Sequence, residues 1–524
     1  MDAAEIRQRL RSGEELAFLD VREEGPYSRA QPLFAVNLPL GRLELEIRRL
    51  VPRGNAPVAL FDDGGGEAER AAVVLDTLGY TDVSIVPGGL NGWRAAGGEI
   101  FRDVNVPSKA FGEWVEAHRH TPMIDAIELK VLLDRKADVV VLDSRPWGEY
   151  RRMTIPTSID CPGAELVLRA RDLAPSPDTL VVVNCAGRTR SIIGAQSLIN
   201  AGLPNPVRAL RNGTIGWTLA GLDLDIGAER RAGPPGPKAL AWAIEAAAGV
   251  AARAEVRVIN AAGLARFEAE SAERGLFKFD VRQPEEHAAG HVAGFFNAPG
   301  GQLVQATDEY VGLRGARIVL ADDDGVRARM TASWLRQLGW SEVFVLDQSL
   351  ADRIGGRGVW QAPSPLPAGP LPLITASQLS RGLPAGDAAV LDLAPSPVHT
   401  VGHIPGAWFA IRSHFASDLE NLPGSGPVVL ASPDGKQAGF AFADARALTS
   451  RPLAVLDGGT EAWIASGLPL ETGIERALSP VDDVYRRPYE GIDNAQEAMQ
   501  AYIEWELGLV EQIRRDGTAT FRPI

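Results

Sequence analysis

Four copies of one pattern run along this chain, and their spacing constrains the fold more strongly than any other feature of the sequence. Each copy begins with a short apolar run around an aspartate, at Asp20, Asp143, Asp280 and Asp392. A second apolar run leads each time into a small-residue or acidic loop, at Asp62, Cys185, Asp322 and Ser432. The two landmarks are 42 positions apart in the first three copies and 40 in the fourth. Self-similarity at a fixed period is typical of tandem structural units.

A third landmark, a glycine-containing turn that leads to tryptophan, closes three of the copies. It places Trp93, Trp217 and Trp463 at 31, 32 and 31 positions after the loop residue. Within a copy, apolar runs alternate with helical patterns such as SIIGAQSLINAG, and this alternation favours a parallel sheet covered by helices on both faces. The loop after the second apolar run is then expected where a strand meets a helix N-terminus, the usual ligand position in such sheets.

The repeats predict an α/β chain of four tandem units followed by a C-terminal extension. We place the units at residues 1–104, 121–227, 255–360 and 372–472, and the extension, a loop and a helix, at residues 473–524. Proline-rich stretches at 233–238 and 361–372 are expected to act as extended linkers. The helix of the extension starts at Asn494, and we expect it to pack across a domain without contributing chemistry.

Charge and composition exclude several classes of protein. The net charge of -14 argues against a general nucleic-acid binder, because no basic surface is available to displace counterions from phosphates. The most apolar long stretch, from Ala239, contains Glu245 and Arg253, so no membrane span is expected. The N-terminal segment lacks the apolar core of a secretory signal, and two cysteines cannot form a disulfide framework. We therefore expect a cytoplasmic protein.

One of the two cysteines, Cys185, lies in the loop CAGRTRS of the second unit, and the residues around it favour an anion. The thiolate is the reactive form of cysteine, and backbone N–H groups at a helix N-terminus stabilise a negative charge. Ala186 and Gly187 are small enough for the backbone to curl round the sulfur. Arg188 and Arg190 add two positive charges. We expect this loop to hold the thiolate and its anionic substrates.

Other polar residues near the loop have more ordinary interpretations. Thr189 and Ser191 are expected either to cap the following helix, the favoured role, or to bind oxygens of a substrate. Asp143 and Arg145 have counterparts in the first and third units, which lack a loop cysteine. A structural role in pinning the strand end or the loop is therefore favoured for this pair over a part in catalysis.

Taken together, these motifs resemble the rhodanese family. The shared features are an aspartate-x-arginine strand end, an apolar strand leading into a cysteine-centred loop, and a closing glycine turn with tryptophan. The fourth unit also contains GHIPGA at 402–407, which is similar to an early loop signature of that family.

The resemblance implies a sulfurtransferase that needs neither a cofactor nor a metal. A cysteine would take sulfane sulfur from thiosulfate or another anionic donor, hold it as a persulfide, and pass it to cyanide or to a thiol such as glutathione or a thioredoxin-like protein. Cys185 matches the nucleophile, and the residues that follow it match the substrate loop: Ala186, Gly187, Arg188, Thr189, Arg190 and Ser191. The equivalent positions, Asp62, Asp322 and Ser432, cannot do this chemistry, so one unit of four is expected to be catalytic.

Two alternatives remain open at this stage. A binding or scaffold protein could use the cysteine to sense persulfide or oxidants. Phosphatases and arsenate reductases of the same fold have five residues between the cysteine and an arginine, whereas only four separate Cys185 from Arg190. The second unit has no histidine between Thr121 and Gly227, which argues against a Cys-His hydrolase.

The remaining candidates are interpreted as structural. Cys161 is expected to be a small buried filler, with a resolving thiol as the alternative. Two histidine pairs, His287 with His291 and His399 with His403, favour loop hydrogen bonding over metal binding, because no third ligand is in register. The carboxylates of Asp62 and Asp322 are expected to fill the anion site that Cys185 occupies in the second unit.

Overall fold

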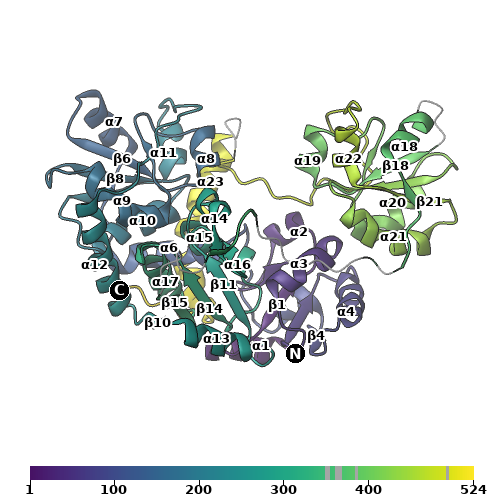
Figure 1. The fold of residues 1–524 in the computed structure, drawn as a ribbon, viewed down its shortest axis with the longest axis horizontal. Coiled ribbons are helices and arrows are strands. Elements are labelled where there is room, and N and C mark those ends of the chain that lie inside the picture. The colour runs from purple at the N-terminus through teal and green to yellow at the C-terminus, as the bar shows by residue number, and fades with distance from the viewer. Residues whose placement is uncertain (348–353, 360–366, 368, 384–387, 491–494) are drawn as a thin grey trace.

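The computed structural model describes residues 1–347, 354–359, 367, 369–383, 388–490 and 495–524. It contains four sheets built from parallel strands, one for each predicted unit, and this confirms the predicted α/β class with four tandem units. Figure 1 shows the units following one another along the chain, with helices on both faces of each sheet. Within the described ranges, no helix is long and apolar enough to cross a membrane.

The second unit has the strand order β5-β9-β8-β6-β7. Its strands are β5 (Met123–Ile124), β6 (Val139–Asp143), β7 (Ile159–Asp160), β8 (Leu180–Asn184) and β9 (Val207–Leu210). Its helices are α7 (Ala126–Asp134), α8 (Trp147–Arg152), the short η2 (Gly163–Glu165), α9 (Leu166–Leu173), α10 (Thr189–Asn200) and α11 (Gly213–Leu219). Central strand β8 is apolar along most of its length and buried, as expected for a parallel strand covered on both faces.

The first unit repeats this arrangement with the order β2-β1-β3-β4. Its elements are α1 (Ala3–Ser12), β1 (Ala17–Asp20), α2 (Glu24–Arg29), β2 (Val36–Asn37), η1 (Leu40–Arg42), α3 (Leu43–Leu50), β3 (Val58–Phe61), α4 (Glu67–Thr77), β4 (Val83–Ile85) and α5 (Gly89–Ala95). Helix α6 (Val106–Arg119) connects it to the second unit, and α12 (Pro237–Arg253) connects the second unit to the third.

The third unit has the order β10-β15-β14-β11-β13 and a separate antiparallel pair, β12-β16. Its elements are β10 (Arg257–Ile259), α13 (Ala261–Ala269), β11 (Leu276–Asp280), α14 (Pro284–Ala289), β12 (His291–Val292), β13 (Phe296–Asn297), α15 (Gly300–Gln305), α16 (Thr307–Tyr310), β14 (Arg317–Ala321), α17 (Val326–Gln337), β15 (Val343–Leu346) and β16 (Ile354–Gly356). Most of the second predicted linker, residues 361–366 and 368, lies outside the described residues.

The fourth unit has the order β17-β21-β20-β18-β19. Its elements are β17 (Leu373–Ile374), α18 (Ala376–Gly382), β18 (Ala389–Asp392), α19 (Ser396–Val401), β19 (Trp408–Phe409), η5 (Arg412–His414), α20 (Phe415–Asn421), β20 (Val428–Ala431), α21 (Lys436–Leu448), β21 (Leu453–Leu456) and α22 (Gly459–Ala465). In Figure 1 this unit stands to one side, and the yellow chain returns from it to the second unit.

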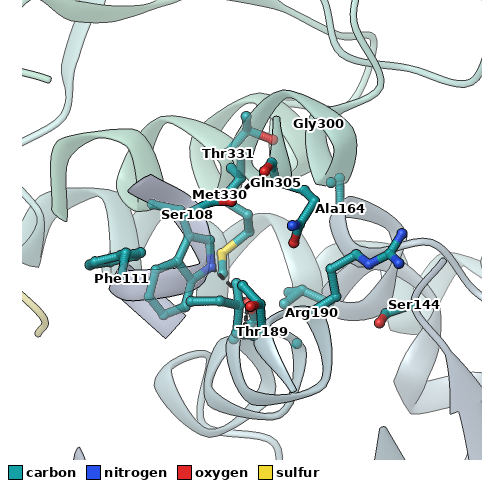
Figure 2. A pocket seen from close by; sticks show the side chains of 18 residues that line it. Ser108, Phe111, Ser144, Ala164, Thr189, Arg190, Gly300, Gln305, Met330 and Thr331 are labelled. Atoms are coloured by element: carbon teal, nitrogen blue, oxygen red, sulfur yellow. Dashed lines mark hydrogen bonds between the residues drawn. The ribbon is translucent and has the colours of Figure 1, made fainter. Parts of the chain in front are cut away.

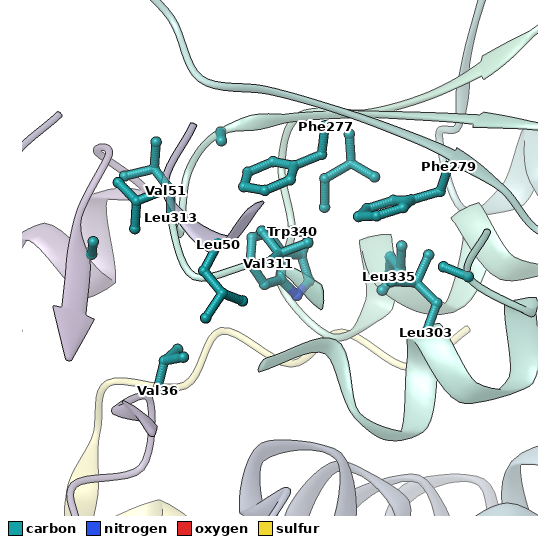
Figure 3. Close-up of a cluster of buried hydrophobic side chains, with 14 of the residues drawn as sticks. Val36, Leu50, Val51, Phe277, Phe279, Leu303, Val311, Leu313, Leu335 and Trp340 are labelled. Atoms are coloured by element: carbon teal, nitrogen blue, oxygen red, sulfur yellow. The ribbon is translucent and has the colours of Figure 1, made fainter. Parts of the chain in front are cut away.

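The first and third units share one hydrophobic core. Figure 3 shows Leu50 and Val51 of the first unit close to Val311, Leu313 and Trp340 of the third. Helix α6 joins the same cluster through Phe111. The first three units are therefore packed together rather than strung on linkers, whereas, among the described residues, the apolar clusters of the fourth unit contain no residue of the other three.

The C-terminal extension forms two helices, α23 (Gln496–Leu507) and α24 (Leu509–Asp516), instead of the single predicted helix. Gly508 separates them, and the predicted start at Asn494 lies outside the described residues. The apolar face of α23 packs on Ile215 of the second unit, while Leu509 and Ile513 of α24 join the core of the first unit. The expectation that this segment packs across a domain is confirmed, and it bridges two.

Candidate active site at the Cys185 loop

Cys185 directly follows strand β8, and helix α10 begins four residues later at Thr189. This confirms the predicted position of the loop between a strand and a helix N-terminus. The parallel register aligns Asp143 with Asn184, so the aspartate and the cysteine lie at the same edge of the sheet. Cys185 itself is only 1% exposed.

The loops of the other units reveal what this position is built to hold. In the first unit, Asp62 accepts hydrogen bonds from the backbone N–H groups of Gly64, Gly66 and Ala68 at 2.9, 2.9 and 3.1 Å. Burial raises the pKa of Asp62, but these backbone hydrogen bonds outweigh it and leave the pKa lowered. The carboxylate therefore fills an anion site made of main-chain amides, as predicted.

The third and fourth units keep the same geometry. Asp322 accepts from Gly325 N at 2.8 Å and from Ala328 N at 2.9 Å, and Ser432 Oγ accepts from Ala438 N at 3.2 Å. For Asp322, burial and the neighbouring Asp324 raise the pKa well above its ordinary value. The predicted filling is confirmed for both aspartates, but the lowered pKa that marks a stabilised carboxylate is found at Asp62 only.

In the first, third and fourth units, one backbone donor follows its acceptor by six positions. Ser191 follows Cys185 by the same interval and lowers the pKa of the thiol. Cys185 therefore occupies the position that the oxygen atoms of Asp62, Asp322 and Ser432 occupy elsewhere.

The glycine turn predicted as the third landmark closes directly on the loop. Gly213 has a φ of +54°, and a Cβ atom there would lie 2.3 Å from the carbonyl oxygen of Cys185. The N–H of Thr214 donates to that same carbonyl at 2.9 Å. Glycine is required here both by the left-handed backbone and by the close approach.

Both arginines of the loop have carboxylate partners. Arg188 is buried and donates to Glu113 of α6 at 2.6 and 2.8 Å, and to Asn212 Oδ1 at 3.1 Å. Arg190 donates to Glu149 of α8 at 2.7 and 2.8 Å. The sequence did not predict Glu113 and Glu149 as partners, because no pattern near the loop motif distinguishes them from other acidic residues.

The predicted stabilisation of the thiolate is not borne out in this structure. Burial raises the pKa of Cys185 above its ordinary value, while Arg190 and Ser191 lower it and Glu506 raises it further. Burial has the largest effect on the pKa because a charged sulfur loses its hydration inside the protein. The expectation that two arginines and the amides hold the sulfur as an anion is therefore wrong, because burial raises the pKa of Cys185 by more than Arg190 and Ser191 lower it.

The predicted helix-capping role of the two hydroxyls is also wrong. Helix α10 has Arg188 at its N-cap and no side-chain capping bond. The hydroxyl of Ser191 donates instead to the carbonyl of Arg188 at 2.8 Å. Thr189 and Ser191 lie inside the first turn of the helix rather than at its N-cap.

Thr189 faces a small pocket between the second and third units (Figure 2). Its volume is about 40 Å³, and its wall includes Arg190, Met330 and Thr331. Among the residues described, the buried oxygens Thr189 Oγ1, Gln305 Oε1 and Thr331 Oγ1 have no hydrogen-bond partner. A pocket of this size has room for ordered water, which needs roughly 10–15 Å³.

Asp143 and Arg145 form a buried ion pair that ties the strand end to its surroundings. Arg145 donates to both carboxylate oxygens at 2.9 and 2.8 Å and to the carbonyl of Met153 at 2.5 Å. Asn184 donates to Asp143 Oδ2 at 2.9 Å. Because the first and third units pair Asp20 with Arg22 and Asp280 with Arg282 in the same way, the geometry fits a structural role.

Helix α23 covers the Cys185 loop, which sequence reasoning did not predict. A Cβ atom on Gly187 would lie 3.3 Å from Glu506 Oε2 and 3.3 Å from Tyr502 Cε1. The Nζ atom of Lys109 on α6 lies 5.2 Å from the centre of the Tyr502 ring. The one available signal was the i, i+4 spacing of Tyr502 and Glu506 on a predicted helix.

The remaining candidates are structural, as predicted. Cys161 is fully buried, and burial raises its pKa well above its ordinary value. His287 and His399 make hydrogen bonds to Asp280 and Asp392, at 3.2 and 2.7 Å. No group of three or more metal-binding side chains that could hold an ion occurs in the described part of the chain.

Comparison with known proteins now assigns the family. A family model described as Rhodanese-like domain matches residues 2–96, 125–220, 265–352 and 375–466. These segments cover more than half of the chain, which therefore belongs to the rhodanese family.

A solved structure from Pseudomonas aeruginosa, described as thiosulfate sulfurtransferase, is 53% identical and has a TM-score of 0.98. The match covers 100% of this chain and 99% of that one, so the arrangement of all four units and the extension is shared. This chain is accordingly a transferase of the rhodanese type.

One curated relative matches a single unit. An HTH-type transcriptional regulator of Mycobacterium tuberculosis is 35% identical over 106 residues, which make up 20% of this chain. The chain spans 46% of the length of that relative.

Proposed function

We propose that this enzyme moves a sulfane sulfur from thiosulfate, or a similar anionic donor, to a thiol or cyanide through a persulfide on Cys185. The observation that carries the proposal is the equivalence of the four loops. Three of them place an oxygen atom of Asp62, Asp322 or Ser432 at the amide site, and only the second offers a nucleophilic sulfur there.

The transfer takes two displacements at sulfur. The Cys185 thiolate attacks the outer sulfur of thiosulfate, an S–S bond forms, and the old S–S bond breaks so that sulfite leaves with its electron pair. An acceptor thiolate, or cyanide, then attacks the terminal sulfur of the persulfide. The acceptor leaves as a persulfide, or as thiocyanate, and the Cys185 thiolate is restored.

Each residue of the loop has a part in this proposal. The backbone around Ala186 and Gly187 surrounds the sulfur and any bound anion with N–H groups. Ser191 and Arg190 lower the pKa of Cys185, which offsets part of the effect of burial. Arg188 holds the loop against α6 through Glu113.

Intact-mass measurement after incubation with thiosulfate tests the proposal. The wild-type protein is expected to gain the mass of one sulfur atom and to lose it again on addition of cyanide. The variant C185S should gain nothing, whereas C161S, which removes the other buried cysteine, should behave as wild type. Additions of oxygen alone would contradict sulfur transfer and favour a redox sensor.

The thiol acceptor is proposed on the same chemical ground. Glutathione and a thioredoxin-like protein both present a thiolate that can attack the terminal sulfur. A steady-state assay with thiosulfate and each acceptor, including cyanide, ranks them by kcat/KM. Equal rates with and without acceptor would contradict the second displacement.

A further inference from the structure

Glu506 places an unpartnered carboxyl oxygen against the catalytic loop. The side chain is only 1% exposed, and its Oε1 accepts a hydrogen bond from Tyr502 Oη at 3.0 Å. Across the described ranges of the chain, Oε2 has no hydrogen-bond partner. This atom lies 3.3 Å from where a Cβ on Gly187, two residues after Cys185, would be.

A buried oxygen without a partner indicates a ligand or an ordered water. Leaving such a group unsatisfied costs about 1–3 kcal/mol, so buried polar atoms in folded proteins are nearly always hydrogen-bonded. Oε2 lies against Gly187, which belongs to the amide loop that starts at Cys185. Oε2 therefore lies at the edge of the site where the sulfur donor would bind.

The charge state of Glu506 suits an anionic ligand. Burial raises its pKa to about 8, with Glu113 acting in the same direction and with Lys109, Arg188 and the Tyr502 hydroxyl acting against it. At neutral pH the carboxyl group is thus mostly protonated, and a neutral carboxyl group donates one hydrogen bond. A carboxyl group kept neutral in this way can act as a hydrogen-bond donor inside a site.

We propose that Glu506 Oε2 is a binding group for the anionic sulfur donor and that Tyr502 positions it. The carboxyl group of Glu506 donates a hydrogen bond to an oxygen atom of thiosulfate, while the outer sulfur of thiosulfate faces Cys185. When Glu506 ionises, the same group repels the dianion instead. The choice of thiosulfate as donor rests on the proposed function.

Several charged or titratable groups face Glu506 and enter any pH dependence. They are Lys109 and Glu113 on α6, Cys185 and Arg188 on the loop, and Tyr502 on α23 itself. Tyr489, in the segment before α23, contacts the Tyr502 ring. Burial raises the pKa of both tyrosines beyond the range of the test below. The variant C185S removes the thiol, so that the titration of Glu506 can be followed without it.

The test measures thiosulfate binding to C185S by calorimetry between pH 6.5 and 9.5. We expect a constant Kd below about pH 7 and, above the pKa of Glu506, a rise of about tenfold per pH unit. C185S/E506Q should bind within about threefold of C185S at pH 7 and should lose the pH dependence, because the amide still donates. C185S/E506A should bind about tenfold more weakly at pH 7, as expected for a lost hydrogen bond to an anion.

Glu504, exposed on the same helix, provides the matched control, and C185S/E504Q should bind as C185S does at every pH. A Kd that does not change with pH, or an unchanged Kd in C185S/E506A, would overturn the role of Glu506. The absence of thiosulfate binding to C185S would also overturn this role. Thermal unfolding checks that the C185S variant is folded.

Failure of the proposed function gives a different result. C185S cannot transfer sulfur, so its binding data stand whether or not the wild-type protein gains sulfur mass. In the wild-type background, E506A should raise the KM for thiosulfate about tenfold while kcat for a saturating donor changes less. An unchanged KM counts against the proposal.

Discussion

Arg188 and Glu113 form a two-point ion pair that joins the Cys185 loop to helix α6, with N···O distances of 2.6 and 2.8 Å. Both side chains are almost fully buried. A planar guanidinium group matched to a carboxylate fixes direction as well as distance, so the pair defines where the loop lies relative to α6.

Replacing Glu113 by Gln should loosen this loop. Breaking a buried pair by removing one partner's charge costs about 3–5 kcal/mol, because the other charge stays buried without compensation. Urea unfolding should show a lower midpoint, and single-turnover sulfur transfer should slow. E116Q, a half-buried change on the same helix, is the control, and an unchanged midpoint in E113Q would contradict the structural role.

Moving the cysteine to the first unit should not move the activity. In D62C/C185S the new thiol would sit in the same amide site, but Asp63 and Glu67 lie beside it where the second unit has Ala186 and Arg190. The acidic neighbours repel an anionic donor, so no gain of sulfur mass is expected after incubation with thiosulfate. A gain comparable to the wild type would show that the loop amides alone are sufficient.

Persulfide formation at saturating thiosulfate should become faster as the pH rises from 6 to 7.5. Burial raises the pKa of Cys185, so the thiolate is the minor form in this range and grows about tenfold per pH unit. Because Arg190 lowers that pKa, R190Q/E149Q should react more slowly at each pH with the same slope. The paired change avoids leaving Glu149 without its partner, and a flat profile in the wild type would show that the thiol is already ionised.

Replacing Gly213 by Ala should displace the carbonyl of Cys185. The new Cβ would lie 2.3 Å from that oxygen, so the loop must shift and single-turnover transfer should fall about tenfold or more. G221A is the matched control, since Gly221 also has a positive φ of +72° but has open space around it. That control should lose about 1–2 kcal/mol of stability and keep its transfer rate. Equal loss of transfer in both variants would point to backbone strain alone.

Much of the fold could be predicted because its signals are local. The 42-residue interval between Asp143 and Cys185 reflects two neighbouring parallel strands, and the glycine at 213 reflects a backbone conformation that other residues avoid. The filling of the first loop by Asp62 also followed from the alignment of the repeats. Each of these features depends only on residues within one unit.

The parts that could not be predicted come from contacts between distant segments. Glu113 belongs to the stretch between the predicted first and second units, and Glu506 lies 321 positions after Cys185. The raised pKa of Cys185 depends on how deeply these segments bury the sulfur. Burial of this kind is a property of the assembled units, so the loop motif alone predicted a more acidic thiol.

The late position of α23 in the chain has a consequence for biosynthesis. A ribosome finishes the second unit long before it makes the helix that closes over Gly187. During that interval the Cys185 loop lacks the contacts that Tyr502 and Glu506 make with it at Gly187 in the folded protein. Translation of α23 then completes the cover over Gly187.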